Sequence, residues 1–303
     1  MFDNLWVRKY APKRLEDIIL TENVRSKVES FKTNQEIPNL LLTGNPGIGK
    51  TSLSKIICND ILDCQYLYIN ASDENGIDVV RTKINQFAQS QSFDSKLKVV
   101  LCDECDGFSS DAQRALRNTM EEYSGITRFI LTANYKYRII PALQSRCQDL
   151  DLTPPLKEVA QRCFDILKKE NIAVEDKAKA LTLIKSLYPD LRKCLNELQK
   201  HSNTGTLIIP DQKNDEVMAM VLEQIKAGKP TAIRKALIQN EHHFNGDYPA
   251  FLRSLFNYID SAETDDNKKK KYLITIADFL YKSAFVADQE LNSYACLIHL
   301  SEV

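Results

Sequence analysis

The sequence predicts an α/β domain with a parallel sheet covered by helices on both faces, followed by all-helical regions. Three observations support this. A glycine-rich motif lies between an apolar run and a helical pattern. Strand patterns alternate with helical patterns up to residue 152, which is typical of a parallel sheet. After Thr153-Pro154-Pro155 only helical patterns remain.

The glycine-rich motif, Gly44 to Thr51, matches G-x-x-x-x-G-K-[ST] and follows the apolar run Leu40–Leu42. A helical pattern continues from Ser52 to Asp60. In a strand–loop–helix unit, the loop N–H groups and the helix dipole surround a phosphate. Lys50 would reach the β- and γ-phosphate oxygens, and the Thr51 hydroxyl would bind Mg²⁺. We therefore expect ATP contacts from Asn45, Pro46, Gly47, Ile48, Gly49, Lys50, Thr51 and Ser52.

The elements after this motif keep the alternation. Strands are expected at Tyr66–Asn70, Lys98–Cys102, Thr127–Thr132 and Gln148–Leu152, with helices at Ile77–Gln89 and Ser109–Glu122. Ligands of such sheets bind outside the carboxyl ends of the strands. The glycine-rich loop, Asp103-Glu104 and Asn134 all fall at that edge.

These edge residues suit the hydrolysis of ATP. Asp103 would hold Mg²⁺, directly or through water, and Glu104 would orient and polarise the water that attacks the γ-phosphate. Asn134 would donate to the γ-phosphate or position the same water. Alternatively, Asn134 only caps the end of its strand. ATP and Mg²⁺ are the expected cofactors.

The remainder of the chain is predicted to be helical. Leu156 to His201 holds three helical patterns, and turn residues at 203–206 and 210–211 mark a boundary. Further helices are expected at 216–227, 231–238, 248–259, 271–285 and 288–300, after a solvated lysine-rich loop at 265–271. We predict three domains, at 1–153, 154–206 and 207–303.

Composition limits the function classes. With 303 residues and a net charge of −1, the chain has no global field to attract nucleic acid, so DNA contacts need a local basic patch. No apolar stretch is long enough to cross a membrane. The eight cysteines include one C-x-x-C pair, Cys102 and Cys105, without a second pair or histidine cluster, so buried thiols are expected instead of zinc.

Five segments together resemble the ATPase subunits of sliding-clamp loaders. They are Trp6–Pro12, the phosphate loop, Asp103-Glu104-Cys105-Asp106, Thr132-Ala133-Asn134 and Ser145-Arg146-Cys147. These AAA+ proteins include replication factor C small subunits and the clamp-loader ATPases of tailed bacteriophages. Asp190–Lys193 and Ser92–Asp94 resemble the bacteriophage type most closely. Cys105 departs from the usual Asp-Glu-Ala-Asp, and we expect the strand end to tolerate a small apolar residue.

The resemblance implies an AAA+ module, a helical lid and an all-helical collar that forms the oligomer. It also implies that Val7 and Tyr10 line the adenine pocket, that Asn134 senses the γ-phosphate and that Arg192 is a second sensor. Arg146 would be an arginine finger acting on the ATP of a neighbouring subunit. From the residues alone, the segment Trp6–Pro12 is equally an arm packed on the core, Arg146 pairs with Asp149, and Arg192 pairs with Asp190.

DNA contacts are expected on two helices. The resemblance implies that Arg81, Lys83 and Arg117 face DNA, and that Gln113 relays between DNA-facing residues and the Glu104 region. The alternative is an exposed helix face with ordinary ion pairs.

The implied function is ATP-dependent loading of a sliding clamp onto primer-template DNA during replication, with hydrolysis stimulated by DNA. The implied partners are the clamp, the DNA and other loader subunits in a pentamer, and no membrane. The implied location is cytoplasmic, in a bacteriophage-infected cell or another replication compartment. Two alternatives are another AAA+ DNA-remodelling ATPase, such as a branch-migration motor, and a scaffold subunit that does not hydrolyse ATP.

Overall fold

A computed structural model describes residues 5–90, 97–202, 205–209, 214–244, 246–263 and 265–302. The chain divides into two compact units, Met1–Ile209 and Pro210–Val303. Ser92–Asp94, one basis of the bacteriophage likeness, lies outside the described residues, as do Asn203, Thr204, Pro210 and Asp211 of the expected boundary. The three-domain division at 153 and 206 stays a prediction.

The first unit contains a five-stranded sheet in the order β2-β3-β4-β1-β5, in which every described pairing is parallel. The strands are β1 Leu40–Thr43, β2 Tyr66–Asn70, β3 Lys98–Asp103, β4 Thr127–Ala133 and β5 Gln148–Asp151. This confirms the predicted parallel sheet. The register places Thr43 beside Ala133 and Asn70 beside Asp103, so the carboxyl ends of these strands meet at one edge.

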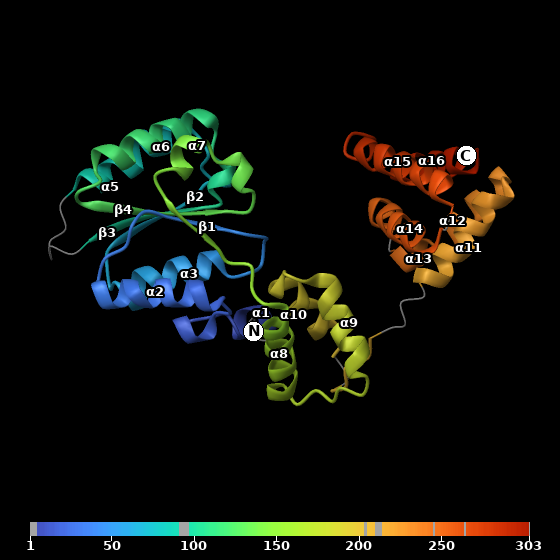
Figure 1. Ribbon diagram of the computed structural model, residues 1–303, viewed down its shortest axis with the longest axis horizontal. Helices are drawn as coiled ribbons and strands as arrows, with labels where there is room; N and C mark the ends of the chain where they lie inside the picture. Colours follow the sequence, from blue (N-terminus) through green and yellow to red (C-terminus); the bar gives the residue numbers. More distant parts are fainter. Residues whose placement is uncertain are drawn as a thin grey trace. The chain divides into compact units, whose positions relative to one another are not determined.

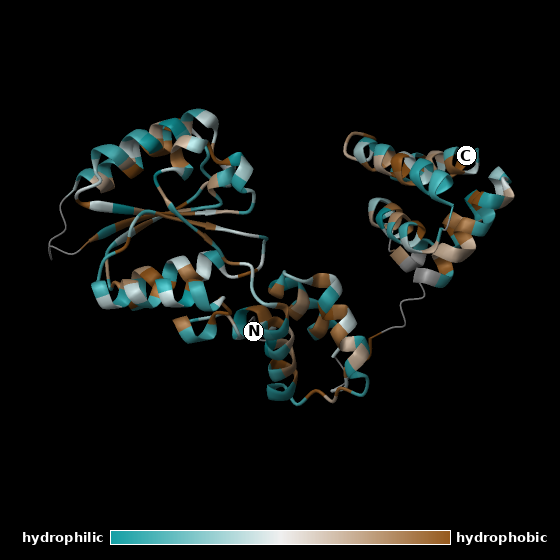
Figure 2. Cartoon of the chain, viewed as in Figure 1, coloured by the Kyte–Doolittle hydropathy of each residue, from teal (hydrophilic) through white to brown (hydrophobic). Residues whose placement is uncertain are grey.

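Helices cover both faces of the sheet, as predicted (Figure 1). On one face lie α2 Glu22–Asn34 and α3 Lys50–Ile56, the latter continued by a π-helical turn at Ile57–Ile61. On the other face lie α4 Ile77–Val79, a π-helical turn at Val80–Ile84, α5 Asn85–Gln89, α6 Ser110–Glu122 and α7 Pro141–Gln144. Because successive strand residues point to opposite faces, Leu40 and Leu42 join one apolar cluster and Leu41 joins the other. Figure 2 shows the resulting hydrophobic strands between helices of mixed hydropathy.

The remaining helices of this unit form a separate cluster: α8 Leu156–Lys169, α9 Lys177–Leu187 and α10 Leu191–Lys200. The short helix α1 Trp6–Lys9 packs against α10, where Trp6 is buried and its backbone N–H donates to Gln199 Oε1 at 2.9 Å. The arm at the start of the chain is therefore packed on the lid helices, and its anchor is an aromatic side chain.

The second unit consists of helices with their own apolar core. They are α11 Asn214–Ala227, α12 Pro230–Gln239, α13 Glu241–Phe244, α14 Tyr248–Ala262, α15 Asp266–Lys282 and α16 Gln289–Ser301. Within the described residues, no helix has the length and apolar character needed to cross a membrane.

The lysine run at the start of α15 corrects one prediction. Lys268 to Lys271 were expected in a loop, but α15 begins at Asp266 and includes all four. The Asp265 carboxylate caps the helix by accepting from the backbone N–H groups of Asn267 and Lys268, at 2.9 and 3.3 Å. Such a cap satisfies donors at the helix start and allows the helix to begin several residues before its apolar face.

Candidate functional site: a nucleotide cavity between sheet edge and lid

The phosphate loop joins β1 to α3 and needs three glycines with positive φ. Gly44, Gly47 and Gly49 have φ values of 130°, 75° and 98°, a region that side chains with a Cβ rarely enter. The Lys50 ammonium donates to the carbonyl oxygens of Gly44 and Asn45, both at 2.7 Å. Burial lowers the pKa of Lys50 to about 8, although the charges of Asp106, Asp103 and Glu104 oppose that shift.

The carboxylate of Asp103, at the end of β3, gathers three hydroxyl donors. The Thr51 hydroxyl lies 2.9 Å from each of its oxygens, the Thr132 hydroxyl 2.6 Å from Oδ1 and the Tyr68 hydroxyl 3.0 Å from Oδ2. The structure therefore brings together Thr51 and Asp103, the two residues expected at the metal. Among the described residues, no cluster of three or more His, Cys, Asp or Glu could hold a metal ion. This donor set still fits Mg²⁺, which takes one or two protein oxygens together with phosphates and water.

The next residue, Glu104, has the left-handed backbone conformation, with φ of 54° and ψ of 41°. Its N–H donates to the Thr132 hydroxyl at 2.9 Å, and its carboxylate accepts from the Ser72 hydroxyl. Non-glycine residues in this conformation are strained and cluster at functional sites. The turn presents the carboxylate of Glu104 to solvent beside the buried Asp103.

Asn134 follows β4 and is held by its backbone. Asp106 accepts from the N–H groups of Asn134 and Tyr135, both at 3.2 Å. In the described part of the chain, the Asn134 side chain makes no hydrogen bond, so the strand end is capped by Asp106 and not by Asn134.

A cavity of about 170 Å³ lies beside the phosphate loop. Its lining comes from the N-terminal region (Val7, Ala11, Pro12, Asp17, Ile18, Ile19), the phosphate loop (Gly47, Ile48, Gly49, Ser52) and the lid region (Pro154, Arg162, Leu191, Arg192, Leu195). Val7 is among these lining residues, whereas Tyr10 is not. The Tyr10 hydroxyl instead donates to Glu170 Oε1 at 2.5 Å. Burial, and to a lesser extent this hydrogen bond, raise the pKa of Tyr10 to about 12.

Arg192 lines this cavity from the first turn of α10. Its charge is one of those that shift the pKa of Lys50, so the two cations lie near each other. Across the described residues, no ion pair joins Arg192 to Asp190, and that alternative is wrong. Asp190 caps α10 by accepting from the Lys193 N–H at 2.9 Å. The same carboxylate lies against the phosphate loop, since a Cβ added to Gly47 would fall 1.8 Å from its Oδ1.

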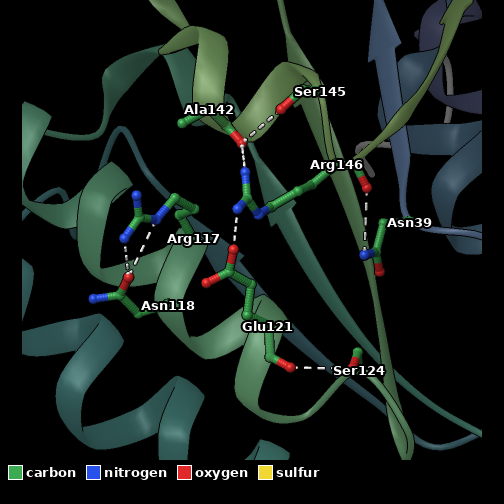
Figure 3. A network of polar contacts seen from close by, with 8 residues as sticks. All are labelled: Asn39, Arg117, Asn118, Glu121, Ser124, Ala142, Ser145 and Arg146. Atoms are coloured by element: carbon green, nitrogen blue, oxygen red, sulfur yellow. Dashed lines mark hydrogen bonds and ion pairs between the residues drawn. The ribbon is translucent and has the colours of Figure 1, made fainter.

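Arg146 follows α7 and is held within the chain (Figure 3). Its guanidinium donates to the Ala142 carbonyl at 2.7 Å and pairs with the Glu121 carboxylate. The alternative pairing with Asp149 is wrong, because Asp149 pairs with Lys136 at 2.6 Å.

The three expected DNA contacts occupy different settings. Arg81 is exposed and lines an open groove between the helix after β2 and α6. Lys83 pairs with Glu74 at 2.6 Å, and the Arg117 guanidinium donates to Asn118 Oδ1. Arg81 is thus the most available of the three.

Gln113 is buried at the start of α6 and is fully bonded. Its amide donates to the carbonyls of Phe108 and Arg138 at 3.2 and 3.1 Å, and it accepts from the Ile140 N–H at 2.8 Å. It joins α6 to the segment after Asn134 and reaches the Glu104 region only through the turn that ends at Phe108.

The eight cysteines, all present as thiols, take no part in this site. Cys102 and Cys105 are buried at the end of β3 and in the turn after it, and burial is the largest cause that raises the pKa of Cys105.

Sequence reasoning overlooked two charged residues that line the cavity, Asp17 and Arg162. The signal that could have found Arg162 is its charge at an inward position of an amphipathic helix.

The fold and this loop define a nucleotide-binding ATPase of the AAA class. Residues 40–154 match the model of the ATPase family associated with various cellular activities, and residues 151–208 match the sliding-clamp-loader large subunit, AAA+ ATPase lid domain. The chain belongs to the family of replication factor C small subunits, the ATPase subunits of clamp loaders in DNA replication.

Two relatives that establish this family membership match nearly the whole chain. The replication factor C small subunit of Methanococcus vannielii is 38% identical, with 96% of each chain covered. That of Aeropyrum pernix is 35% identical, covering 99% of this chain and 97% of the relative. A RuvB variant from Thermotoga maritima shares the fold, with a TM-score of 0.54, 19% identity and coverage of 77% and 88%. The nearer likeness to the bacteriophage type stays a prediction.

Proposed function

We propose that this chain is one subunit of a pentameric clamp loader, which places a sliding clamp on primer-template DNA. DNA stimulates the hydrolysis of ATP by this chain. The observation that carries the proposal is the bonding of the Thr51 hydroxyl to both oxygens of Asp103 at the sheet edge. It joins the phosphate loop to the carboxylate at the end of β3, the pairing that ATP hydrolysis requires. Family membership favours this function over a branch-migration motor or a non-hydrolysing scaffold.

Hydrolysis at this site depends on positioning and charge. Thr51 and Asp103 would hold Mg²⁺, which supplies charge neutralisation on the phosphates. Lys50 donates to the phosphate oxygens in place of its present carbonyl partners. Glu104 orients the attacking water, and Asn134 donates toward the γ-phosphate from a backbone that Asp106 fixes.

The two arginines act from opposite sides of the nucleotide. Arg192 enters the cavity from the lid of the same chain. Arg146 leaves Glu121 and reaches the ATP of a neighbouring subunit. The pair it leaves is open to solvent, with side chains 33% and 49% exposed, and such pairs contribute only about 0–1 kcal/mol.

DNA binds through a local basic surface, because the net charge of −1 supplies no general attraction. Arg81, Lys83 and Arg117 contact phosphates, and Gln113 couples α6 to the segment after the γ-phosphate sensor. Residues 154–206 form the lid, and 207–303 form the collar through which subunits assemble. The chain works in the cytoplasm, in a bacteriophage-infected cell or another replication compartment.

The test is the ATPase rate of the reconstituted assembly alone, with primed DNA, with the cognate clamp and with both. We expect DNA and clamp together to raise the rate. Lys50→Ala is the matched control for the nucleotide site and should abolish turnover under every condition. A rate that neither ligand changes would contradict clamp loading while leaving ATP binding intact.

A further inference from the structure

The lid helix α8 presents a guanidinium to the nucleotide cavity. Val159, Cys163 and Ile166 of α8 are buried in the lid core, and Arg162 lies three residues after Val159 and four before Ile166. These spacings place it on the same face of the helix. Arg162 is therefore half-buried instead of fully solvated, and it lines the cavity.

Arg162 differs from the comparable arginines in having no acceptor. The half-buried Arg25, Arg117, Arg128 and Arg146 each donate at least one hydrogen bond. Within the described ranges, Arg162 donates none and forms no ion pair. A partly desolvated guanidinium without a hydrogen-bond partner is unfavourable, and the Asp17 carboxylate, whose pKa its charge lowers, makes no hydrogen bond with it. This points to a partner that enters the cavity.

The packing of the lid core shows which part of the cavity wall lies beside Arg162. Arg192 shifts the pKa of Lys50, so it lies toward the phosphate loop. Val7, Tyr10 and Ile19 of the N-terminal region pack against the lid core that contains Val159, Cys163 and Ile166. The charge of Arg162 lowers the pKa of Asp17 and opposes the rise in the pKa of Tyr10. Arg162 thus lies beside the N-terminal region, whose apolar residues Val7, Ile18 and Ile19 line the same cavity.

We propose that Arg162 is a nucleotide-binding residue of the lid, whose planar guanidinium stacks on the adenine ring of the bound ATP. A guanidinium is weakly hydrated and stacks well on aromatic faces, and a purine offers such a face. The apolar residues of the N-terminal region would contact the base on its other side. This inference rests on the proposed nucleotide site, and it makes the lid respond to the base as well as to the γ-phosphate.

Binding of ATP and of inorganic tripolyphosphate to the full chain, measured by calorimetry, tests the proposal. Arg162→Gln should weaken ATP binding about 5- to 30-fold and leave tripolyphosphate binding unchanged. Arg192→Gln should weaken both ligands, because that side chain faces phosphates. Lys168→Gln, an exposed position on the same helix, is the matched control and should change neither.

The outcomes separate this inference from the proposed function. Equal weakening of ATP and tripolyphosphate by Arg162→Gln would place the guanidinium on phosphates and overturn base stacking. Unchanged ATP binding, or a fall in the thermal midpoint that accounts for the loss, would make the role structural and overturn it as well. If the wild-type chain failed to bind ATP at all, the nucleotide site itself would be wrong.

Discussion

The guanidinium of Arg146 pairs with the carboxylate of Glu121 in its own chain, although both side chains remain partly exposed (Figure 3). If Arg146 acts on a neighbour's ATP, this pair holds the guanidinium within its own chain until the neighbour's phosphate replaces Glu121. An exposed ion pair is weak enough to exchange for a phosphate. Loss of the pair and loss of the arginine should therefore have different consequences.

Arg146→Ala is expected to lower the ATPase rate of the assembly at least about 1,000-fold, because an arginine finger stabilises transition-state charge. ATP affinity of the separate chain should stay unchanged. Glu121→Gln is the matched control: it removes the pair, should retain turnover and should change the unfolding free energy by less than about 1 kcal/mol. Mixing Arg146→Ala with Lys50→Ala, which keeps Arg146 but cannot turn over its own ATP, should restore part of the turnover. No recovery in such mixtures would contradict action between subunits.

Lys50 predicts a pH dependence of stability in the absence of nucleotide. Burial lowers its pKa to about 8 in the folded chain, against about 10.4 when unfolded. Below pH 8 the folded state carries the full cost of the buried ammonium. Between these values the unfolded state binds more protons, so the stability of the folded state rises with pH.

Urea unfolding of the wild type and of Lys50→Met, from pH 7 to pH 10.5, measures this effect. The unfolding free energy of the wild type should rise relative to the variant by up to about 3 kcal/mol, the equivalent of the shift in pKa. Groups elsewhere titrate alike in both proteins and cancel. A difference that is constant with pH would show that the ammonium is not desolvated.

Asp103→Asn should lower the ATPase rate at least about 100-fold, because the amide loses one acceptor and the negative charge that suits Mg²⁺. Binding of ATP measured with a metal chelator present should change little. Tyr68→Phe removes one of the hydroxyl donors at 3.0 Å and serves as the control, with turnover nearly intact. A similar loss in both variants would indicate disturbed packing instead of a lost metal ligand.

Gly47→Ala is expected to weaken ATP binding more than Gly49→Ala. Both positions have positive φ, so both substitutions are strained. Only at position 47 would the new Cβ meet the Asp190 carboxylate, whereas nothing lies within 4 Å at position 49. In titrations with ATP, adding Asp190→Ala to Gly47→Ala should recover part of the loss. No recovery would show that backbone strain alone causes the defect.

Gln113→Leu should lower the unfolding free energy by about 2–4 kcal/mol, because it leaves buried backbone groups without their partners. Stimulation of ATPase by primed DNA should fall more than the basal rate, since the tie from α6 to the segment after Asn134 is lost. Gln86→Leu, at an exposed position, is the control for chemical denaturation. Equal losses of basal and stimulated rates would argue against coupling.

The sequence by itself determined the phosphate loop, the strands and the gathering of Thr51, Asp103 and Asn134 at one sheet edge. Glycine-rich loops and apolar periodicity are local signals, and in a parallel sheet the strand ends share an edge. The lysine run Lys268 to Lys271 was predicted to lie in a loop, but it lies in the first turns of α15, because the cap by Asp265 lets the helix begin at Asp266.

Only the tertiary structure decided which partners the charged side chains take. Several of these contacts join residues that are distant in the chain: Arg146 pairs with Glu121 instead of Asp149, and Asp190 lies against Gly47. Gln113 bonds to the backbone of Ile140, and Arg162 lines the same cavity as the phosphate loop. A charged or polar side chain has several acceptors of the right chemistry within its reach along the sequence. Packing of the lid and of the helices on the sheet selects one of them, since it fixes which groups approach within hydrogen-bond distance.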